Sequence, residues 1–484
     1  MSDEIHDQAV MTFEVLKAAV RDGVAARLGK LALAGRKTVI DTPNFFAGTS
    51  RGVVPHITPD NVSKHLHAGG AYMALEDFIE RPQQYYTRKP PIFDTPTPLP
   101  PGKPLHSFTA MPPSITTVLA ARRIPAVPAP MGNSNNSISI FTSVGFQVLT
   151  TKEYHNAVEA LKPDIAIPLA DLTNHSTAPN TKRALRMADR TDQWVKEFFD
   201  ELDTQDVLNP SKISTFAPIL PIDYSIQWEY IERLAEDLFP HLAGLAVYDL
   251  DVLPDIADKY ANLLTLPRLS LSAPATPHHI LRQIGLGIDL FTIPFINTVS
   301  DSGLALTFTF PSPSSQLEPA DAQPNGTGTS LKPLGMDLSC PSNQISLAPL
   351  LENCTCYACT NHHKAYIHHL LNAREMLGWT LLQIHNHAVI SQFFASIRET
   401  LSLGQEAFEA AVEKFTLTYE PDFPAGTGEK PRARGYHYKS GAGEGKRNKP
   451  GWSKLGGDET PAAEKENGNP ADVAPVTVAA DVNA

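Results

Sequence analysis

Membrane-spanning runs and secretion signals are missing from this chain of 484 residues. No stretch approaches the roughly 18 consecutive apolar residues that a helix needs to cross a bilayer. The start, MSDEIHDQAV, carries Asp3, Glu4 and Asp7 where a secretory signal peptide would carry positive charge and then an apolar run. We therefore expect a cytoplasmic protein that neither crosses a membrane nor enters the secretory pathway.

Positive charge is also in short supply. The chain has 40 Lys and Arg against 52 Asp and Glu, a formal net charge of -12 at pH 7. Because proteins bind phosphate backbones largely through Lys and Arg that displace counterions, this balance argues against a chain that wraps nucleic acid by itself. A local basic patch is needed for RNA contact. Residues 430–454, with eight Lys or Arg against Glu444, are the candidate.

Cysteine is scarce, and four residues in so long a chain exclude a disulfide framework. Three of them nevertheless stand within six residues, as Cys354, Cys356 and Cys359 in the pattern C-x-C-x-x-C. A loop folded round one ion brings such thiolates together, so the cluster predicts a closed, structural zinc site of the Cys3His type.

The fourth zinc ligand stays open on the residues alone. The candidates are His362, His363, His368, His369, His385, His387 and Cys340. Residues 364–399 have a strongly helical pattern, and a helical hairpin or kinked helix would bring the second half of this segment back to the cysteine loop. Spacing therefore favours His385, which lies near the middle of the segment.

A G-x-G-x-x-G turn is missing after every early strand-like run, which disfavours an open dinucleotide-binding sheet. Short apolar runs such as DIAIPL, HLAGLAVY, LPRLSL and ALTFTF alternate instead with helical patterns such as YSIQWEYIERLAEDLF and TPHHILRQIGLGIDLF. Strands that alternate with helices at this spacing are typical of βαβ units and a parallel sheet. Together with the length, they predict an α/β fold of the (β/α)8 TIM-barrel type.

Proline is the residue in excess, with 42 copies, and it marks chain length that lies outside the fold. It crowds residues 88–130, which we interpret as an extended insertion because proline removes a ladder donor. Residues 312–336 are polar and predict a mobile insertion. We expect the barrel over residues 1–335, a late inserted zinc-binding subdomain with closing helices over 336–418, and a disordered tail over 419–484.

The segment CTCYACTNHHKAYIHHLLNAREMLGWTLLQIHN resembles the zinc-binding region of the tRNA-guanine transglycosylase family. In that family a ligand histidine follows the third cysteine by 26 residues, and from Cys359 this spacing leads to His385. TSVGFQVLT (142–150) is similar to the family's T-D-S-G-G-(Phe/Tyr)-Q-V, and AGLAVYD (243–249) is similar to G-G-L-A-V-G-E. The resemblance implies a (β/α)8 barrel with one structural zinc ion, held by Cys354, Cys356, Cys359 and His385.

Family members exchange the wobble guanine of certain tRNA anticodons for a queuosine-type base by means of two aspartates, a nucleophile and a general acid/base. The matching positions here are Thr292, which follows GIDLF, and Thr142, which precedes SVGFQ. A neutral hydroxyl without an adjacent base does not replace an ionised carboxylate, so the resemblance implies no catalytic residue in this chain. The base-recognition aspartate falls on Ala170 or Asp171, depending on the register.

A kept zinc motif beside lost carboxylates is similar to the non-catalytic, accessory branch of the eukaryotic queuine tRNA-ribosyltransferases. It implies a heterodimer with a catalytic subunit, contact with tRNA through that complex, and a cytoplasmic location with peripheral association with the mitochondrial outer membrane. Two alternatives stay open. The chain is either a self-sufficient transglycosylase or base hydrolase that uses Asp289, Asp171 or another carboxylate, or a stand-alone RNA-binding scaffold.

Overall fold

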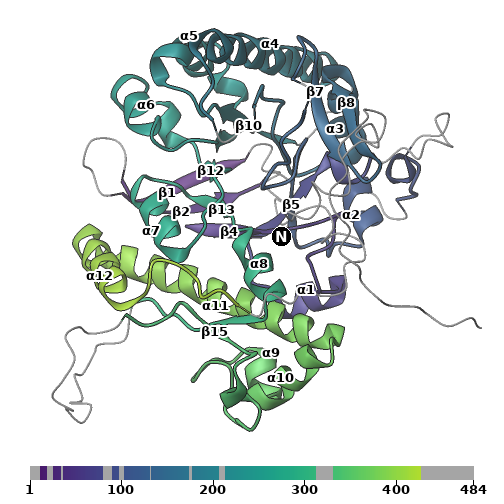
Figure 1. Cartoon of the computed structure of the whole chain (residues 1–484). Helices are drawn as coiled ribbons and strands as arrows, with labels where there is room; N and C mark the ends of the chain where they lie inside the picture. The colour runs from purple at the N-terminus through teal and green to yellow at the C-terminus, as the bar shows by residue number, and fades with distance from the viewer. Residues whose placement is uncertain are drawn as a thin grey trace, which may run out of the picture. The chain divides into compact units, whose positions relative to one another are not determined.

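A closed barrel of eight parallel strands forms the centre of the fold (Figure 1). It closes where the last of these strands pairs in parallel with the first, with Leu290 opposite Asn44. The predicted barrel fold is thus confirmed. In barrel order the strands are β4 (Asn44–Gly48), β5 (Gly70–Ala74), β6 (Thr116–Ala120), β9 (Ile165–Ala166), β10 (Ser214–Ile219), β11 (Gly244–Val247), β12 (Arg268–Ser270) and β13 (Leu290–Thr292).

The computed structural model describes ten ranges of the chain, all within one compact unit, Met1–Gly441. These ranges are residues 11–18, 25–33, 36, 38–79, 90–97, 103–130, 132–173, 177–206, 213–311 and 331–426. Residues 427–484 of the predicted tail and 312–330 of the predicted insertion lie outside them. Within the described ranges, no helix combines the length and the hydrophobicity needed to span a membrane.

Helices follow the barrel strands along the chain and bury an apolar face on the barrel. On α5, for example, Tyr230, Ile231 and Leu234 are buried in the main core cluster. A hairpin of β7 (Ser137–Thr142) and β8 (Gly145–Thr150) is inserted between β6 and its helix. The helices are α1 (Pro59–His65), α2 (Pro104–Thr109), α3 (Thr151–Leu161), α4 (Thr181–Asp206), α5 (Tyr224–Glu236), α6 (Leu253–Lys259), α7 (Pro277–Gly285) and α8 (Phe295–Asp301).

The helical run predicted over TPHHILRQIGLGIDLF is too long. Helix α7 ends at Gly285, and Gly287 has a φ of 84°, a left-handed conformation that glycine adopts readily and that ends a helix. A side chain at Gly287 would also collide with Arg268, because its Cβ would lie 2.4 Å from Nη1. The end of the run therefore turns back into the barrel as β13.

The interpretation of residues 88–130 as an extended insertion is wrong for its second half. This range contains α2 and β6, and β6 is the third strand of the barrel, buried along its whole length. Its sequence, TTVLA, has no proline, and the nearest prolines, Pro113 and Pro125, stand outside the strand where no ladder bond is lost. A short strand between proline clusters therefore escapes an argument from composition.

Residues at the predicted boundaries are also part of the folded unit. Strand β15 (Gly335–Asp337) runs across the predicted 335/336 border and pairs with β14 (Leu304–Leu306). Tyr419, assigned to the tail, is 4% exposed, and its hydroxyl accepts a hydrogen bond from the Thr309 amide at 3.1 Å. The fold thus continues beyond residue 418.

An antiparallel sheet covers the amino-terminal end of the barrel. It consists of β1 (Thr12–Ala18), β2 (Arg27–Ala32) and β3 (Val39–Thr42), and β3 leads directly into β4. Leu31 and Ile40 of this sheet pack in one cluster with side chains of the barrel interior. Because this end is closed, a ligand would reach the barrel from the carboxyl-terminal end of its strands, where barrel active sites lie.

Helix α11 (Met376–Leu403) completes the ring of helices. Its Phe394 lies 5.5 Å, between ring centroids, from both Phe45 of β4 and Phe291 of β13, so the helix covers the seam where the barrel closes. Between α8 and α11 the chain forms β14, β15, α9 (Tyr357–Asn361) and α10 (Lys364–Asn372), and α12 (Gln405–Thr418) follows α11. Figure 1 shows α9 and α10 on the side of α11 that faces away from the barrel.

Candidate metal centre and barrel mouth

Four candidate metal ligands from two parts of the chain converge in the structure. Cys354 and Cys356 lie in the turn before α9, Cys359 lies in α9, and His385 lies on α11. Nδ1 of His385 lies 3.8, 3.6 and 3.4 Å from the Sγ atoms of Cys354, Cys356 and Cys359. All four ligand atoms lie within 4.8 Å of one another. Of the candidates for the fourth ligand, it is therefore His385 that joins the cysteines.

These separations fit a tetrahedral metal site. With a metal–sulfur bond of about 2.3 Å and a metal–nitrogen bond of about 2.0 Å, tetrahedral geometry separates sulfur and nitrogen ligands by roughly 3.5 Å. The four residues can therefore hold one metal ion.

The hydrogen bond of the second ring nitrogen of His385, Nε2, determines which nitrogen carries the proton. Nε2 lies 2.9 Å from the carbonyl oxygen of Leu306, which can only accept, so Nε2 carries the proton and Nδ1 is free to bind metal. The next residue, Asn386, accepts from the Leu306 amide at 2.8 Å and donates to the Leu304 carbonyl at 3.0 Å. Strand β14 thus orients His385 directly through Leu306, and Asn386 fixes the strand against α11. The spacing of the ligands does not reveal this role of Asn386.

The other ligand candidates have different surroundings. Nδ1 of His363 accepts from the Tyr366 amide at 3.2 Å and caps α10. Nδ1 of His368 faces the carbonyl of Leu338, and His387 is fully buried, which lowers its pKa to about 3. Three further candidates also lie outside the cluster of four: His362, His369 and Cys340.

The two threonines at the expected catalytic positions both hydrogen-bond to the backbone. Thr292 ends β13, and its hydroxyl donates to the Ser270 carbonyl at 3.4 Å. Thr142 ends β7, and its hydroxyl donates to the Gly145 carbonyl at 2.9 Å. Since each proton is directed at a carbonyl oxygen and not at a base, neither hydroxyl is activated for nucleophilic or acid/base chemistry.

Asp289, the first alternative carboxylate, lies at the wrong end of the barrel for catalysis. It precedes β13 at the closed end and is fully buried. Its two oxygens accept from Nε and Nη2 of Arg27 at 2.8 and 2.5 Å, and one of them also accepts from the Arg268 amide at 2.7 Å. Asp289 is therefore a structural anion that ties the covering sheet to the barrel.

Asp171, the second alternative carboxylate, lies near the open end but is fully paired. Arg183 and Arg190 of α4 form salt bridges with it, at 2.5 and 3.1 Å, and Asn133 donates to it at 2.6 Å. Burial alone would raise the pKa of Asp171, but the hydrogen bonds from Arg183 and Asn133 lower it below its ordinary value. The neighbouring Ala170, in contrast, lines the cavity at the barrel mouth. The cavity therefore has a methyl group where the alternative register would place a recognition aspartate.

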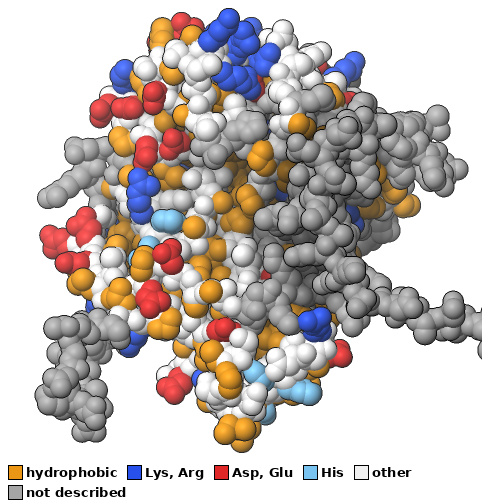
Figure 2. Space-filling view, in the orientation of Figure 1, with side chains coloured by type: hydrophobic (Ala, Val, Ile, Leu, Met, Phe, Trp, Pro, Cys, Tyr) orange, Lys and Arg blue, Asp and Glu red, His pale blue; other side chains and the backbone are white. Residues whose placement is uncertain are grey.

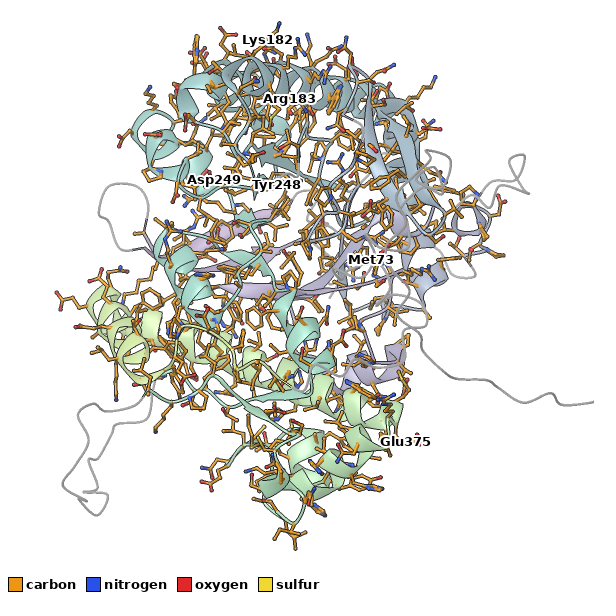
Figure 3. All side chains as sticks on the ribbon, in the orientation of Figure 1. Met73, Lys182, Arg183, Tyr248, Asp249 and Glu375 are labelled. Carbon is orange, nitrogen blue, oxygen red and sulfur yellow. The ribbon has the colours of Figure 1, made fainter. Side chains whose placement is uncertain are left out.

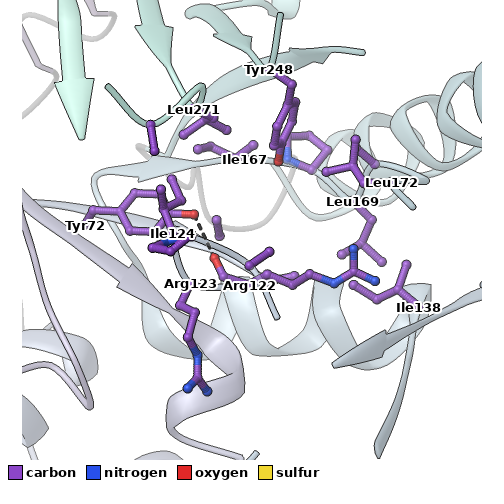
Figure 4. A pocket seen from close by; sticks show the side chains of 17 residues that line it. Tyr72, Arg122, Arg123, Ile124, Ile138, Ile167, Leu169, Leu172, Tyr248 and Leu271 are labelled. Carbon is purple, nitrogen blue, oxygen red and sulfur yellow. Dashed lines mark hydrogen bonds between the residues drawn. The ribbon is translucent and has the colours of Figure 1, made fainter. Parts of the chain in front are cut away.

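The barrel mouth contains a cavity of about 250 Å³ (Figure 4). Its described lining is largely apolar and includes no Asp or Glu, and its polar side chains are those of Tyr72, Arg122, Arg123 and Tyr248. Tyr248 follows β11 and stands at the last glycine position of the G-G-L-A-V-G-E stretch. Sequence reasoning missed this ring, although the glycine-to-tyrosine difference in AGLAVYD was a visible signal.

A buried ion-pair network fixes one wall of this mouth. The carboxylate of Glu76 accepts hydrogen bonds from the amide and Nε of Arg123 at 2.9 and 2.8 Å, and from the Phe141 amide at 2.9 Å. Asp77 lies 3.1 Å from Nη2 of Arg123. These acids therefore anchor the β7–β8 hairpin to the barrel and are engaged in structure.

Positive charge gathers on the first part of α4, where Lys182, Arg183, Arg186 and Arg190 stand against Asp189 alone. Figure 2 shows Lys and Arg side chains together over this helix. Figure 3 shows Lys182 on its outer side and Arg183 on the side of Tyr248 and the barrel mouth, far from Glu375 near the metal-binding region. Since Arg183 is paired with Asp171, this patch adds less free charge than its composition indicates.

Comparison with known proteins shows which family the chain belongs to. The family model described as queuine tRNA-ribosyltransferase matches residues 22–421. The queuine tRNA-ribosyltransferase accessory subunit 2 of Schizosaccharomyces pombe is 33% identical over 422 residues, which cover 87% of this chain and 88% of that protein. The proteins of the same name from Homo sapiens and Xenopus tropicalis are each 27% identical over 410 residues, covering 78% of this chain and 93% and 94% of theirs. The chain belongs to the queuine tRNA-ribosyltransferase family.

Proposed function

We propose that this chain is the non-catalytic subunit of a heterodimeric queuine tRNA-ribosyltransferase and supports the exchange of guanine for queuine at the wobble position of tRNA anticodons. The observation that carries the proposal is a contrast within one chain. The four metal-ligand residues converge, while the two expected catalytic positions are threonines bonded to backbone carbonyls. The names of the relatives agree with an accessory role.

The chemistry of the reaction explains why a partner is needed. Attack on a ribose carbon requires an ionised nucleophile and a second group that moves a proton. At the open end of the barrel, Glu76, Asp77 and Asp171 are each engaged by an arginine. We infer that both catalytic aspartates come from the catalytic subunit.

We further propose that the metal is a single zinc ion with a structural role. Three sulfurs and one imidazole nitrogen suit tetrahedral zinc, and four protein ligands leave no open position for a substrate or an activated water. Bound there, zinc would supply coordination bonds that link the α9 turn to α11. The part played by this chain's own residues is to present three thiolates and Nδ1, with Leu306 holding the proton of Nε2.

The proposal is tested by base exchange into tRNA with purified components. Labelled guanine or queuine incorporation is measured with this chain alone, with the catalytic subunit alone and with the two mixed. We expect incorporation only in the mixture. Incorporation by this chain alone would establish the self-sufficient enzyme instead, and failure of the two proteins to co-purify from cells of the source would favour the stand-alone scaffold.

The subcellular location of the chain stays a prediction. We propose a cytoplasmic location, and a peripheral association with the mitochondrial outer membrane rests on resemblance alone. Fractionation of cells that express the tagged full-length chain distinguishes the two, since a peripheral association is released from the membrane pellet by salt.

A further inference from the structure

Within the described ranges, Arg122 differs from Arg123, Arg183 and Arg190 around the barrel mouth because it forms no salt bridge. Arg123, Arg183 and Arg190 each form a salt bridge with Glu76 or Asp171. Among the described residues, the side chain of Arg122 donates only to neutral acceptors.

These acceptors leave part of the guanidinium unsatisfied. Nε and Nη2 of Arg122 bond to the Ser139 carbonyl at 3.1 and 2.7 Å, and Nη2 also bonds to Asn133 at 3.1 Å. Nη1 is buried and has no hydrogen-bond partner in the described part of the chain. A buried guanidinium with an unpaired donor is costly, and a fixed anion would offset that cost.

The mouth cavity lies where such an anion would be needed. Arg122 follows β6, at the carboxyl-terminal end of the barrel, and contributes to the cavity lining. In Figure 4 its side chain extends toward Ile138 and Leu172, while Tyr248 enters from the opposite side with its hydroxyl toward the interior. Burial raises the pKa of Tyr248 to about 12 although the charge of Arg122 lowers it, so this hydroxyl keeps its proton at neutral pH and can donate.

We propose that the mouth cavity binds a small oxyanion, a phosphate- or carboxylate-bearing compound, that accepts a hydrogen bond from the hydroxyl of Tyr248 and is attracted by the positive charge of Arg122. The apolar remainder of the lining would contact the body of an organic anion. This assignment goes beyond the accessory function and does not depend on it.

The properties of the cavity decide which compounds fit. A volume of about 250 Å³ holds several water molecules, each with a share of about 30 Å³ in the liquid, and therefore suits a small molecule better than a polynucleotide. The described lining has no Asp or Glu, so it offers no carboxylate to accept hydrogen bonds from the N–H groups of guanine. An acceptor-rich ligand is thus favoured over a donor-rich base.

Calorimetric titration and thermal unfolding of the full-length chain test the proposal, in a buffer free of phosphate and carboxylates. The probes are inorganic phosphate, acetate, succinate, guanine and tRNA. We expect saturable binding and an increase in Tm with at least one of the small oxyanions and none with guanine. Arg122→Gln should weaken this binding roughly tenfold or more, because the positive charge beside the cavity is lost. Arg282→Gln, in an exposed surface pair, is the matched control and should keep it.

A second variant keeps the test valid if Arg122→Gln does not fold. Tyr248→Phe removes one hydroxyl and should weaken the same binding by about threefold to tenfold. The proposal is overturned if no small oxyanion binds the wild-type chain, if binding survives both Arg122→Gln and Tyr248→Phe, or if only tRNA or guanine binds. Repeating the titration on the complex with the catalytic subunit separates this result from the test of the accessory function.

Discussion

The metal centre and the barrel mouth show how differently two sites of one chain can relate to the chemistry of its family. At the metal centre, the cysteines and His385 are held within ligand distance by α9, α11 and β14. At the mouth, Thr292 and Thr142 make backbone hydrogen bonds, and Ala170 and Tyr248 shape the remaining space. The four metal-ligand residues stay together while the mouth has no activated catalytic group at the expected positions, as we expect if the proposed zinc ion stabilises the fold and takes no part in catalysis.

Loss of the metal is expected to have the largest effect. Cys359→Ser or His385→Ala should abolish binding of one zinc ion per chain and unfold the α9–α11 region, since structural zinc sites contribute on the order of 10 kcal/mol in apparent binding energy. Metal content by elemental analysis and Tm are the measurements. Cys340→Ser, an exposed cysteine outside the cluster, is the matched control and should change neither. A His385→Ala protein that keeps its zinc would show that the ligand set is wrong.

The closed end of the barrel provides the next largest effect. Asp289→Asn should reduce the free energy of unfolding by about 3–5 kcal/mol, because it leaves Arg27 buried and unpaired. Denaturant unfolding measures this loss. Asp251→Asn, in the exposed pair with Arg282, should have little effect on stability. If Asp289 were instead a catalytic group, its replacement would alter base exchange in the heterodimer at unchanged stability.

The next prediction restores a carboxylate to the barrel mouth, at the position where the family has its nucleophile. Thr292→Asp places a charge at a position that is 2% exposed, and we expect a stability loss of about 1–3 kcal/mol from its desolvation. We expect no base exchange by this variant alone, because the Thr142 hydroxyl supplies no general base. Thr292→Val, neutral and of similar shape, is the control for packing. Exchange by Thr292→Asp alone would show that the mouth still binds substrate productively.

The smallest effect concerns acid stability. The pKa of Asp171 is lower in the folded chain than its ordinary value of 3.8. The charged carboxylate therefore stabilises the folded state at pH values above 3.8, and this stabilisation is lost as the pH falls through the lowered pKa. The difference in Tm between wild type and Asp171→Asn should therefore be largest near neutral pH and narrow below about pH 4. A difference that stays constant over this range would contradict ionic pairing with Arg183 and Arg190.

Local sequence patterns predicted two parts of the molecule, the barrel and the cluster of metal-ligand residues. The alternation of apolar runs and helical patterns predicted the barrel, and the step from Cys359 to His385 led to the residues that converge. Composition failed for residues 88–130, because strand β6 is short and lies between proline clusters. Contacts distant in sequence could not be predicted. Asp289 meets Arg27 across 262 positions, and only the fold shows that this pair lies at the closed end.

Helix α11 has a consequence for the order in which the chain folds. His385 is only 26 to 31 residues from the three cysteines, whereas Arg398 on the same helix donates to Pro43 across 355 residues. Since closing a short loop costs less entropy than closing a long one, a metal ion can organise α9–α11 before the barrel seam forms. The helix would then be ordered before it packs against β4 and β13. Its docking on the barrel would cost less conformational entropy, because its own segment would already have lost that entropy.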